Sequence, residues 1–223
     1  MAALERRLQS QLNRIASLLA RAYGRPRRRL EDPLESLIET VLSQNTSDLN
    51  SGRAYRALRT RFPSWAGMAR AKPRAIESVI RGGGLARTKS RRIHRLLRLI
   101  RDRERGYDLR GWRRLDPARA AERLDLPGVG PKTRACVQLF ALGQAAFPVD
   151  THVHRIVLRL GLAPRRATAA AAQERLTPAV PMGRALDLHL NLIRLGREVC
   201  RPRLPRCTAC PLGGVCRHAW RQA

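Results

Sequence analysis

A lysine and an aspartate close to one glycine turn are the residues of this chain best suited to chemistry. Lys132 follows the turn in Leu-Pro-Gly-Val-Gly-Pro-Lys-Thr at 126–133, and Asp150 comes eighteen positions later in Pro-Val-Asp-Thr-His. A neutral amine is a nucleophile, and a carboxylate can stabilise a developing positive charge. Glycines at a helix start let backbone N–H groups approach an anion closely. The alternative is a plain turn between packed helices, with Lys132 binding phosphate and Asp150 acting as a helix N-cap.

Local signals predict the elements that must position these residues. The Asp-Pro dipeptide at 116–117 is a helix start, because an N-cap oxygen precedes a residue without an N–H group. Gly128 and Gly130 form the turn, and Pro131 suits the first position of a second helix that ends near Gly143. The segment is therefore predicted as helix, hairpin, helix. It lacks the Gly-x-x-x-x-Gly-Lys-Ser/Thr pattern, so a nucleotide P-loop is not expected.

The rest of the chain also carries helical patterns, and strand signals are scarce. Amphipathic or buried helices are predicted at 34–42, 54–61, 93–100 and 152–160. Proline and glycine residues separate these segments. We therefore expect an almost entirely α-helical fold.

The charge balance indicates a polyanionic partner. The chain has 45 Lys plus Arg against 17 Asp plus Glu, a formal net charge of +28. Such an excess favours binding to nucleic acid, which should weaken steeply with salt because counterions are released. A biased genome composition can explain the preference for arginine over lysine, but it does not explain the deficit of acidic residues. Every apolar run is interrupted by arginine, so no membrane span or membrane partner is expected.

Four cysteines near the end of the chain form the second strong pattern. They have the spacing C-x6-C-x2-C-x5-C, and prolines and glycines lie between them: Cys200, Cys207, Cys210 and Cys216. Zinc sites usually show two close cysteine pairs, and only one close pair occurs here. Four thiolates in a wider loop favour an iron–sulfur cluster of the 4Fe-4S kind, with zinc and disulfides as alternatives. Cys136 stands apart and is expected in the core.

Together, the 126–133 turn, Asp150 and the cysteine spacing resemble the helix-hairpin-helix DNA glycosylases of the endonuclease III type. The resemblance extends from about Leu34 to Cys216. It implies two helical domains with the active site in the cleft between them. The first is a six-helix barrel at 26–144 with the helix-hairpin-helix. The second combines 1–25 with 145–223 and ends in the 4Fe-4S cluster loop.

The same resemblance implies the catalytic roles. Lys132 matches the lysine that attacks C1′ of the sugar, expels the base and forms a Schiff base, after which β-elimination cuts the strand. Asp150 matches the carboxylate that stabilises the positive charge at C1′. A lysine attacks only when neutral, and the partial positive charge of a helix N-terminus disfavours the ammonium form.

Other residues are implied to contact DNA. In the helix and loop at 37–48, Gln44 or Asn45 would fill the gap left by a flipped nucleotide. A second loop contains Leu85, whose side chain would wedge beside that nucleotide, and Lys89, which follows it, would also contact DNA. The remaining expected DNA contacts lie in the hairpin turn, at the start of the helix after Asp150 and in the first cysteine loop: Gly128, Val129, Gly130, His152, Arg201 and Arg203.

The sequence departs from the usual endonuclease III pattern in ways that bear on the substrate. Pro131 stands where a basic residue often precedes the lysine, and the loop Gln-Asn-Thr-Ser-Asp at 44–48 also resembles 5-methylcytosine-excising relatives. We expect a bifunctional glycosylase and AP lyase that removes oxidised pyrimidines from damaged double-stranded DNA. The alternatives are a glycosylase for uracil, G:T mismatches or 5-methylcytosine, and a noncatalytic damage-sensing protein. A cytoplasmic monomer at the nucleoid is expected in a prokaryote, and an organelle or the nucleus in a eukaryote.

Overall fold

The structure, a computed structural model of this chain, describes residues 2–221. Every regular element in these residues is helical and none of them forms a strand, so the predicted all-α fold class is confirmed. The chain divides into two compact units. Residues 30–144 form the hairpin unit, and residues 1–29 together with 145–223 form the cysteine unit. None of the described helices combines the length and the apolar character needed to cross a bilayer.

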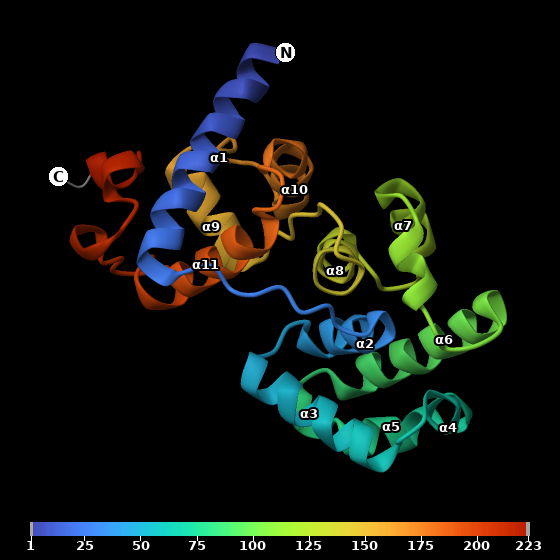
Figure 1. The fold of residues 1–223 in the computed structure, drawn as a ribbon. Helices are drawn as coiled ribbons and strands as arrows, with labels where there is room; N and C mark the ends of the chain where they lie inside the picture. The colour runs from blue at the N-terminus through green and yellow to red at the C-terminus, as the bar shows by residue number, and fades with distance from the viewer. Residues whose placement is uncertain (1, 222–223) are drawn as a thin grey trace. The chain divides into compact units, whose positions relative to one another are not determined.

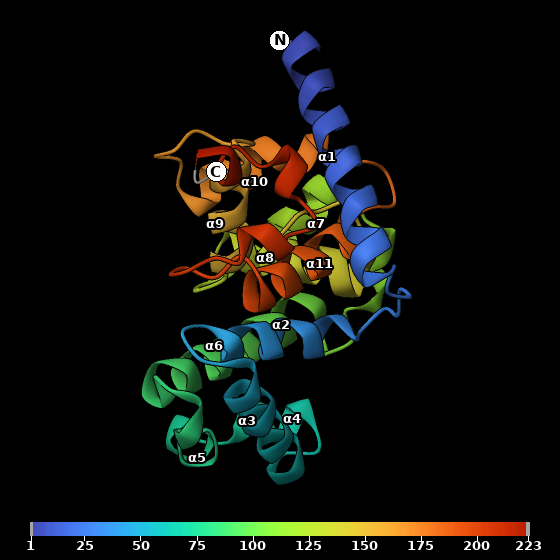
Figure 2. The same ribbon diagram turned by 90° about the vertical axis from the view of Figure 1, so that its left-hand side faces the viewer.

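The hairpin unit is a bundle of short helices around one apolar core. Its elements are α2 (Pro33–Ser43), α3 (Asp48–Arg61), α4 (Trp65–Arg70), α5 (Pro73–Val79), η1 (Arg81–Gly83), α6 (Ala86–Glu104), η2 (Arg110–Arg114), α7 (Pro117–Arg123), α8 (Pro131–Cys136) and η3 (Val137–Leu142). Helices α3, α4 and α5 lie on one side of α2 and α6, and α7 and α8 lie on the other (Figures 1 and 2). Leu37, Ile93 and Val137 are completely buried between them.

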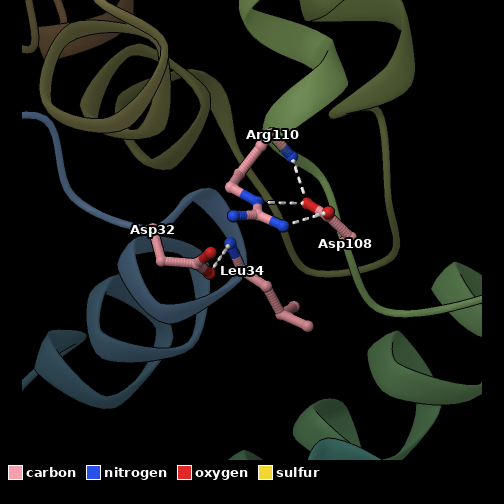
Figure 3. Close-up of polar contacts among 4 residues, drawn as sticks. All are labelled: Asp32, Leu34, Asp108 and Arg110. Atoms are coloured by element: carbon pink, nitrogen blue, oxygen red, sulfur yellow. Dashed lines mark hydrogen bonds and ion pairs between the residues drawn. The ribbon is translucent and has the colours of Figure 1, made fainter.

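Helix α2 leads into the loop at 44–47, and its start is well defined. The Asp32 carboxylate caps it by accepting hydrogen bonds from the Leu34 and Glu35 N–H groups at 3.0 and 3.1 Å. Figure 3 shows this cap with Arg110 nearby, whose guanidinium forms a fork with Asp108. The hydrogen bond from the Arg110 side chain lowers the pKa of Asp108 to about 2.

The predicted helix-hairpin-helix is present in residues 117–142. Helix α7 begins where the Asp-Pro signal placed it, because the Asp116 carboxylate accepts from Ala118 and Arg119 N–H groups. Helix α8 begins at Pro131 and continues as the π-helical η3, which ends at Gly143 with a φ of 72°. The π-helical turn was not predicted.

The cysteine unit has a second core, formed by helices that are far apart in the sequence. Its elements are α1 (Ala2–Tyr23), α9 (Thr151–Leu160), α10 (Ala169–Leu176), η4 (Thr177–Ala179), α11 (Ala185–Glu198), η5 (Cys207–Ala209), η6 (Gly213–Val215) and η7 (Ala219–Arg221). Helix α1 lies along α11, and α11 packs against α9 (Figure 2). Leu12, Phe147 and Val157 are fully buried in this core.

Candidate active site

The hairpin turn presents Lys132 at the second position of α8, half-buried. Gly128 has a φ of 81°, which favours glycine, and both Gly128 and Gly130 are exposed. Within the part of the chain that the structure describes, their N–H groups donate no hydrogen bond, so they remain available to an anion. Val129 differs, because its side chain is only 4% exposed and its N–H donates to the Leu126 carbonyl at 2.9 Å. Val129 therefore stabilises the turn from inside rather than offering a contact.

Gln44 lies against this turn. Its amide Nε2 donates to Thr133 Oγ1 at 3.3 Å and to the Gly128 carbonyl at 3.5 Å, and its Oε1 accepts from Arg92. The Arg92 side chain covers Gly128 so closely that a Cβ there would overlap the guanidinium. The structure thus brings one of the two candidate gap-filling residues into contact with the hairpin, next to Lys132.

Arg92 was not singled out from the sequence. It lies one turn after Lys89 on α6, a helix with many arginines, and no local signal separates it from the others. Only the three-dimensional contacts with Gln44 and Gly128 distinguish it.

The other candidate insertion residues lie at the tips of two loops. Asn45 and Leu85 have φ values of 52° and 49°, in the left-handed region that non-glycine residues rarely adopt. Asn45 is exposed, and Leu85 is 56% exposed although it is a large apolar residue. The structure therefore places both side chains where another molecule can reach them.

Lys89 does not occupy the surface position that was expected. Its side chain is 2% exposed, and its ammonium donates to the carbonyls of Leu42 and Gly83 at 2.6 and 2.7 Å. The expected contact between Lys89 and DNA is therefore wrong, because the group that would bind a phosphate is enclosed in the core. Burial also lowers the pKa of Lys89.

Asp150, the second candidate catalytic residue, lies at the start of α9 in the cysteine unit. It is half-buried and caps α9, since its carboxylate accepts from the Val153 N–H at 2.7 Å. His152, in the first turn of α9, contacts Arg155 with 3.2 Å between Nδ1 and Nη2. Arg155 also donates to the carbonyls of Gly196 and Cys200, which joins α9 to the end of α11 and to the first cysteine.

The four cysteines line one small cavity of about 20 Å³ together with Val199 and Pro205. No group of three or more His, Cys, Asp or Glu side chains within residues 2–221 is close enough to hold a single metal ion. The thiols thus surround a common space without meeting at one point. Burial, and then the neighbouring cysteines, raise the pKa of the Cys207 thiol.

Arg159 of α9 fixes the first cysteine loop. Its guanidinium donates to Cys200 Sγ at 3.1 Å and to the carbonyls of Arg201 and Pro202 at 2.8 and 3.0 Å. Arg201, Arg203 and Arg206 are all exposed around this loop. The loop therefore exposes several positive charges, and Arg159 of α9 holds its backbone in place.

Comparisons with known proteins agree with this architecture. Residues 38–182 match the family model of the HhH-GPD superfamily base excision DNA repair proteins. Endonuclease III of Thermotoga maritima is 35% identical, over 83% of this chain and 83% of that protein. The putative DNA glycosylase At3g47830 of Arabidopsis thaliana is 34% identical over 82% of this chain, which spans 66% of that longer relative.

A solved structure matches almost the whole fold. The trapped endonuclease III–DNA covalent intermediate, an estranged-adenine complex, aligns with a TM-score of 0.82 and 28% identity, over 96% of this chain and 98% of that one. This chain belongs to the HhH-GPD superfamily of base excision DNA repair proteins, among its DNA glycosylases of the endonuclease III type.

Proposed function

We propose that the protein is a bifunctional DNA glycosylase and AP lyase that removes oxidised pyrimidines from double-stranded DNA. The observation that carries this proposal is the position of Lys132. The chain has three lysines: Lys132 lies in the first turn of α8 directly after the glycine turn, Lys89 is enclosed in the core, and Lys72 is the exposed residue before α5. Helix α5 lies on the other side of α2 and α6 from α8 (Figure 1). Only Lys132 combines a helix start, partial exposure and a phosphate-binding turn.

Lys132 would release the base and then cut the strand through a covalent intermediate. The neutral Lys132 amine attacks C1′ of an extrahelical nucleotide, and the bond from C1′ to the base breaks with its electron pair leaving on the base. One proton of the resulting ammonium passes to the departing base and the other to O4′ as the sugar ring opens, which leaves a Schiff base between Lys132 and C1′. Removal of a C2′ proton then breaks the C3′–O bond by β-elimination, which cuts the strand 3′ to the lesion. Water releases Lys132.

Asp150 would stabilise the positive charge that develops at C1′ as the base departs. An oriented carboxylate in a site with little water can contribute strongly to such a step. The N-cap hydrogen bond from Val153 fixes the carboxylate at the start of α9 and leaves the second oxygen for this role. The turn amides of Gly128 and Gly130 would bind the DNA backbone, and exposed Arg201 and Arg203 would bind further phosphates.

The four cysteines supply the donor set of a 4Fe-4S cluster, because they line one common cavity and four thiolates are the ligands that such a cluster takes. A polynuclear cluster needs four thiolates distributed around a volume, whereas one zinc ion needs its ligands at about 2.3 Å from one point. Cys200, Cys207, Cys210 and Cys216 would hold the cluster, whose role here is to shape the arginine loop. Purified protein should be brown with about four irons, and stoichiometric zinc without colour would contradict this assignment.

A panel of duplexes tests the reaction and its substrate. Thymine glycol, uracil, G:T, 5-methylcytosine and abasic duplexes are incubated with the protein, and base release and strand cleavage are measured separately. We expect release of thymine glycol followed by cleavage, and direct cleavage of the abasic duplex. Preference for another base would support the mismatch or modified-base alternative. Binding without any base release or cleavage would support the noncatalytic alternative.

A further inference from the structure

Lys89 is a fully buried lysine that faces two carbonyl oxygens and no acidic side chain. Its Nζ donates to the Leu42 and Gly83 carbonyls at 2.6 and 2.7 Å, and no ion pair to Lys89 occurs in the described chain. A buried cation without a carboxylate partner is costly, and charge-assisted hydrogen bonds such as these two hold their acceptor groups strongly in place.

The two carbonyls belong to the stems of two different loops. Leu42 lies in the last turn of α2, two residues before Gln44, and Gly83 ends η1, two residues before Leu85. Both are acceptors at helix ends, where carbonyls lack partners within their own helix. One ammonium on α6 therefore ties the loop after α2 to the loop before α6.

The tips of these loops lie beside each other and both are strained. Asn45 and Leu85 adopt left-handed backbone conformations, and a Cβ placed on Gly84 would lie 3.7 Å from the Asn45 carbonyl oxygen. Such conformations persist only when the surrounding structure determines them. Gly83 adds a second restraint, since a Cβ on it would lie 3.2 Å from the Ala54 side chain of α3.

We propose that Lys89 is a positioning residue that joins the loops at 44–47 and 84–85 into one rigid wedge for entering the base stack. The proposal rests on the proposed function, because only an enzyme that flips a base out of a duplex needs such a wedge. Lys89 touches no DNA itself. It keeps an exposed leucine and a polar loop at a fixed separation, so that both enter together and the cost of ordering them is met before binding.

Two variants of Lys89 and one control separate this role from simple stabilisation. Lys89→Met keeps the apolar stem and removes the donors, and Lys89→Arg keeps charge and donors on a different head group. Lys72→Met removes one positive charge from an exposed lysine outside both loops and serves as the control for lost charge. Each variant is assayed on duplex DNA with a lesion and on single-stranded DNA with an abasic site, which has no base stack to open.

We expect Lys89→Met to lose about tenfold to a hundredfold in rate on the duplex, the range that small misplacements cost, and to cleave the single strand at nearly the native rate. Fluorescence of 2-aminopurine opposite the lesion, which reports unstacking, should rise less than with native protein. The rate of Lys89→Arg on the duplex should lie between those of the native protein and Lys89→Met. An equal loss on both substrates, or no loss on the duplex, would overturn the proposal.

Amide hydrogen exchange tests the wedge without any catalysis. In Lys89→Arg, and in Lys89→Met if it folds, exchange at 43–47 and at 81–86 should accelerate together while the hairpin at 126–133 is unchanged. Acceleration of only one loop, or of the whole hairpin unit, would contradict the wedge. If native protein acts on neither DNA substrate, the proposed function fails, and the exchange result still decides whether Lys89 joins the loops.

Discussion

The loops at 44–47 and 84–85 of the hairpin unit and the cysteine segment at 200–220 both consist of irregular backbone, and different interactions hold each of them in place. Both present irregular backbone and exposed residues, including Leu85 at 56% and Leu204 at 89% exposed, each with a left-handed φ. The loops at 44–47 and 84–85 are attached to a large core and held by polar side chains, among them the buried Lys89 and the half-buried Gln44. In residues 200–220, by contrast, Leu212 is the only buried side chain.

The two regions differ in what keeps their backbone ordered. A segment with so little buried apolar surface gains little from the hydrophobic effect and needs another source of order. Arg159 supplies part of it, and four thiolates on a shared cluster would supply the rest. The hairpin loops should therefore be indifferent to metal, whereas the cysteine segment should depend on it.

Loss of the proposed cluster is expected to have the largest effect, and this effect should differ between the two regions. Chelation of iron, or Cys207→Ala, should make residues 200–220 sensitive to protease and leave 126–133 protected, because only the former lacks its own core. Limited proteolysis with mass spectrometry measures this. Cys136→Ala, in the buried part of α8, is the control and should remain brown. Equal loss of protection in both units would contradict the contrast.

Asp150 is expected to give the next largest effect, on activity. Asp150→Asn keeps an oxygen that can accept from the Val153 N–H, but it removes the negative charge. The rate of base release should fall about a hundredfold, as for other lost electrostatic groups, while thermal stability stays close to native. Asp150→Ala should in addition cost about 1 kcal/mol of stability as a lost cap. If Asp150→Asn releases base at the native rate, Asp150 is only a cap.

Two glycines of the hairpin turn form a matched pair with a smaller expected effect. Gly128 has a positive φ and lies under Arg92, whereas Gly130 has a φ of −79° and open space where a Cβ would be. Gly128→Ala should lower the free energy of unfolding by about 1–3 kcal/mol and displace Arg92 and Gln44. Gly130→Ala should leave stability nearly unchanged. Urea unfolding followed by circular dichroism compares them, and equal effects would refute the packing of Arg92 on the turn.

The smallest expected effect lies far from the proposed chemistry. Asp32→Ala removes the cap of α2 and should lower stability by about 1 kcal/mol, without changing the ratio of duplex to single-strand cleavage. Thermal unfolding and the two-substrate assay measure both quantities. A changed ratio would mean that the start of α2, and not Lys89 near its end, sets the loop geometry.

Local signals in the sequence predicted the local structure well. The Asp116 cap, the glycine turn and the start of α8 at Pro131 depend on neighbouring residues, and each is present as predicted. The all-α class, which was predicted from helical patterns within short segments, is also confirmed. These features are set by backbone preferences that act within a few positions of the chain.

Features that depend on distant contacts could not be predicted. Lys89 follows Arg87 and Thr88 in a basic helix, where a lysine is expected at the surface. It is nevertheless buried, and its ammonium donates to the carbonyls of Leu42, 47 positions away, and Gly83, six positions away. Gln44 meets Thr133 across 89 positions, and Arg92 meets Gln44 across 48. No periodicity or spacing encodes such pairings, which arise only when α2, α6 and α8 pack together.

Borohydride trapping of the protein on duplex DNA that carries a lesion or an abasic site tests whether Lys132 is the nucleophile. We predict one covalent adduct that peptide mapping places on Lys132, full trapping by Lys72→Met, and no adduct with Lys132→Ala. Since the chain has only three lysines, the mapping has few alternatives. An undiminished adduct in Lys132→Ala, or an adduct mapped to another amine in the native protein, would contradict the account.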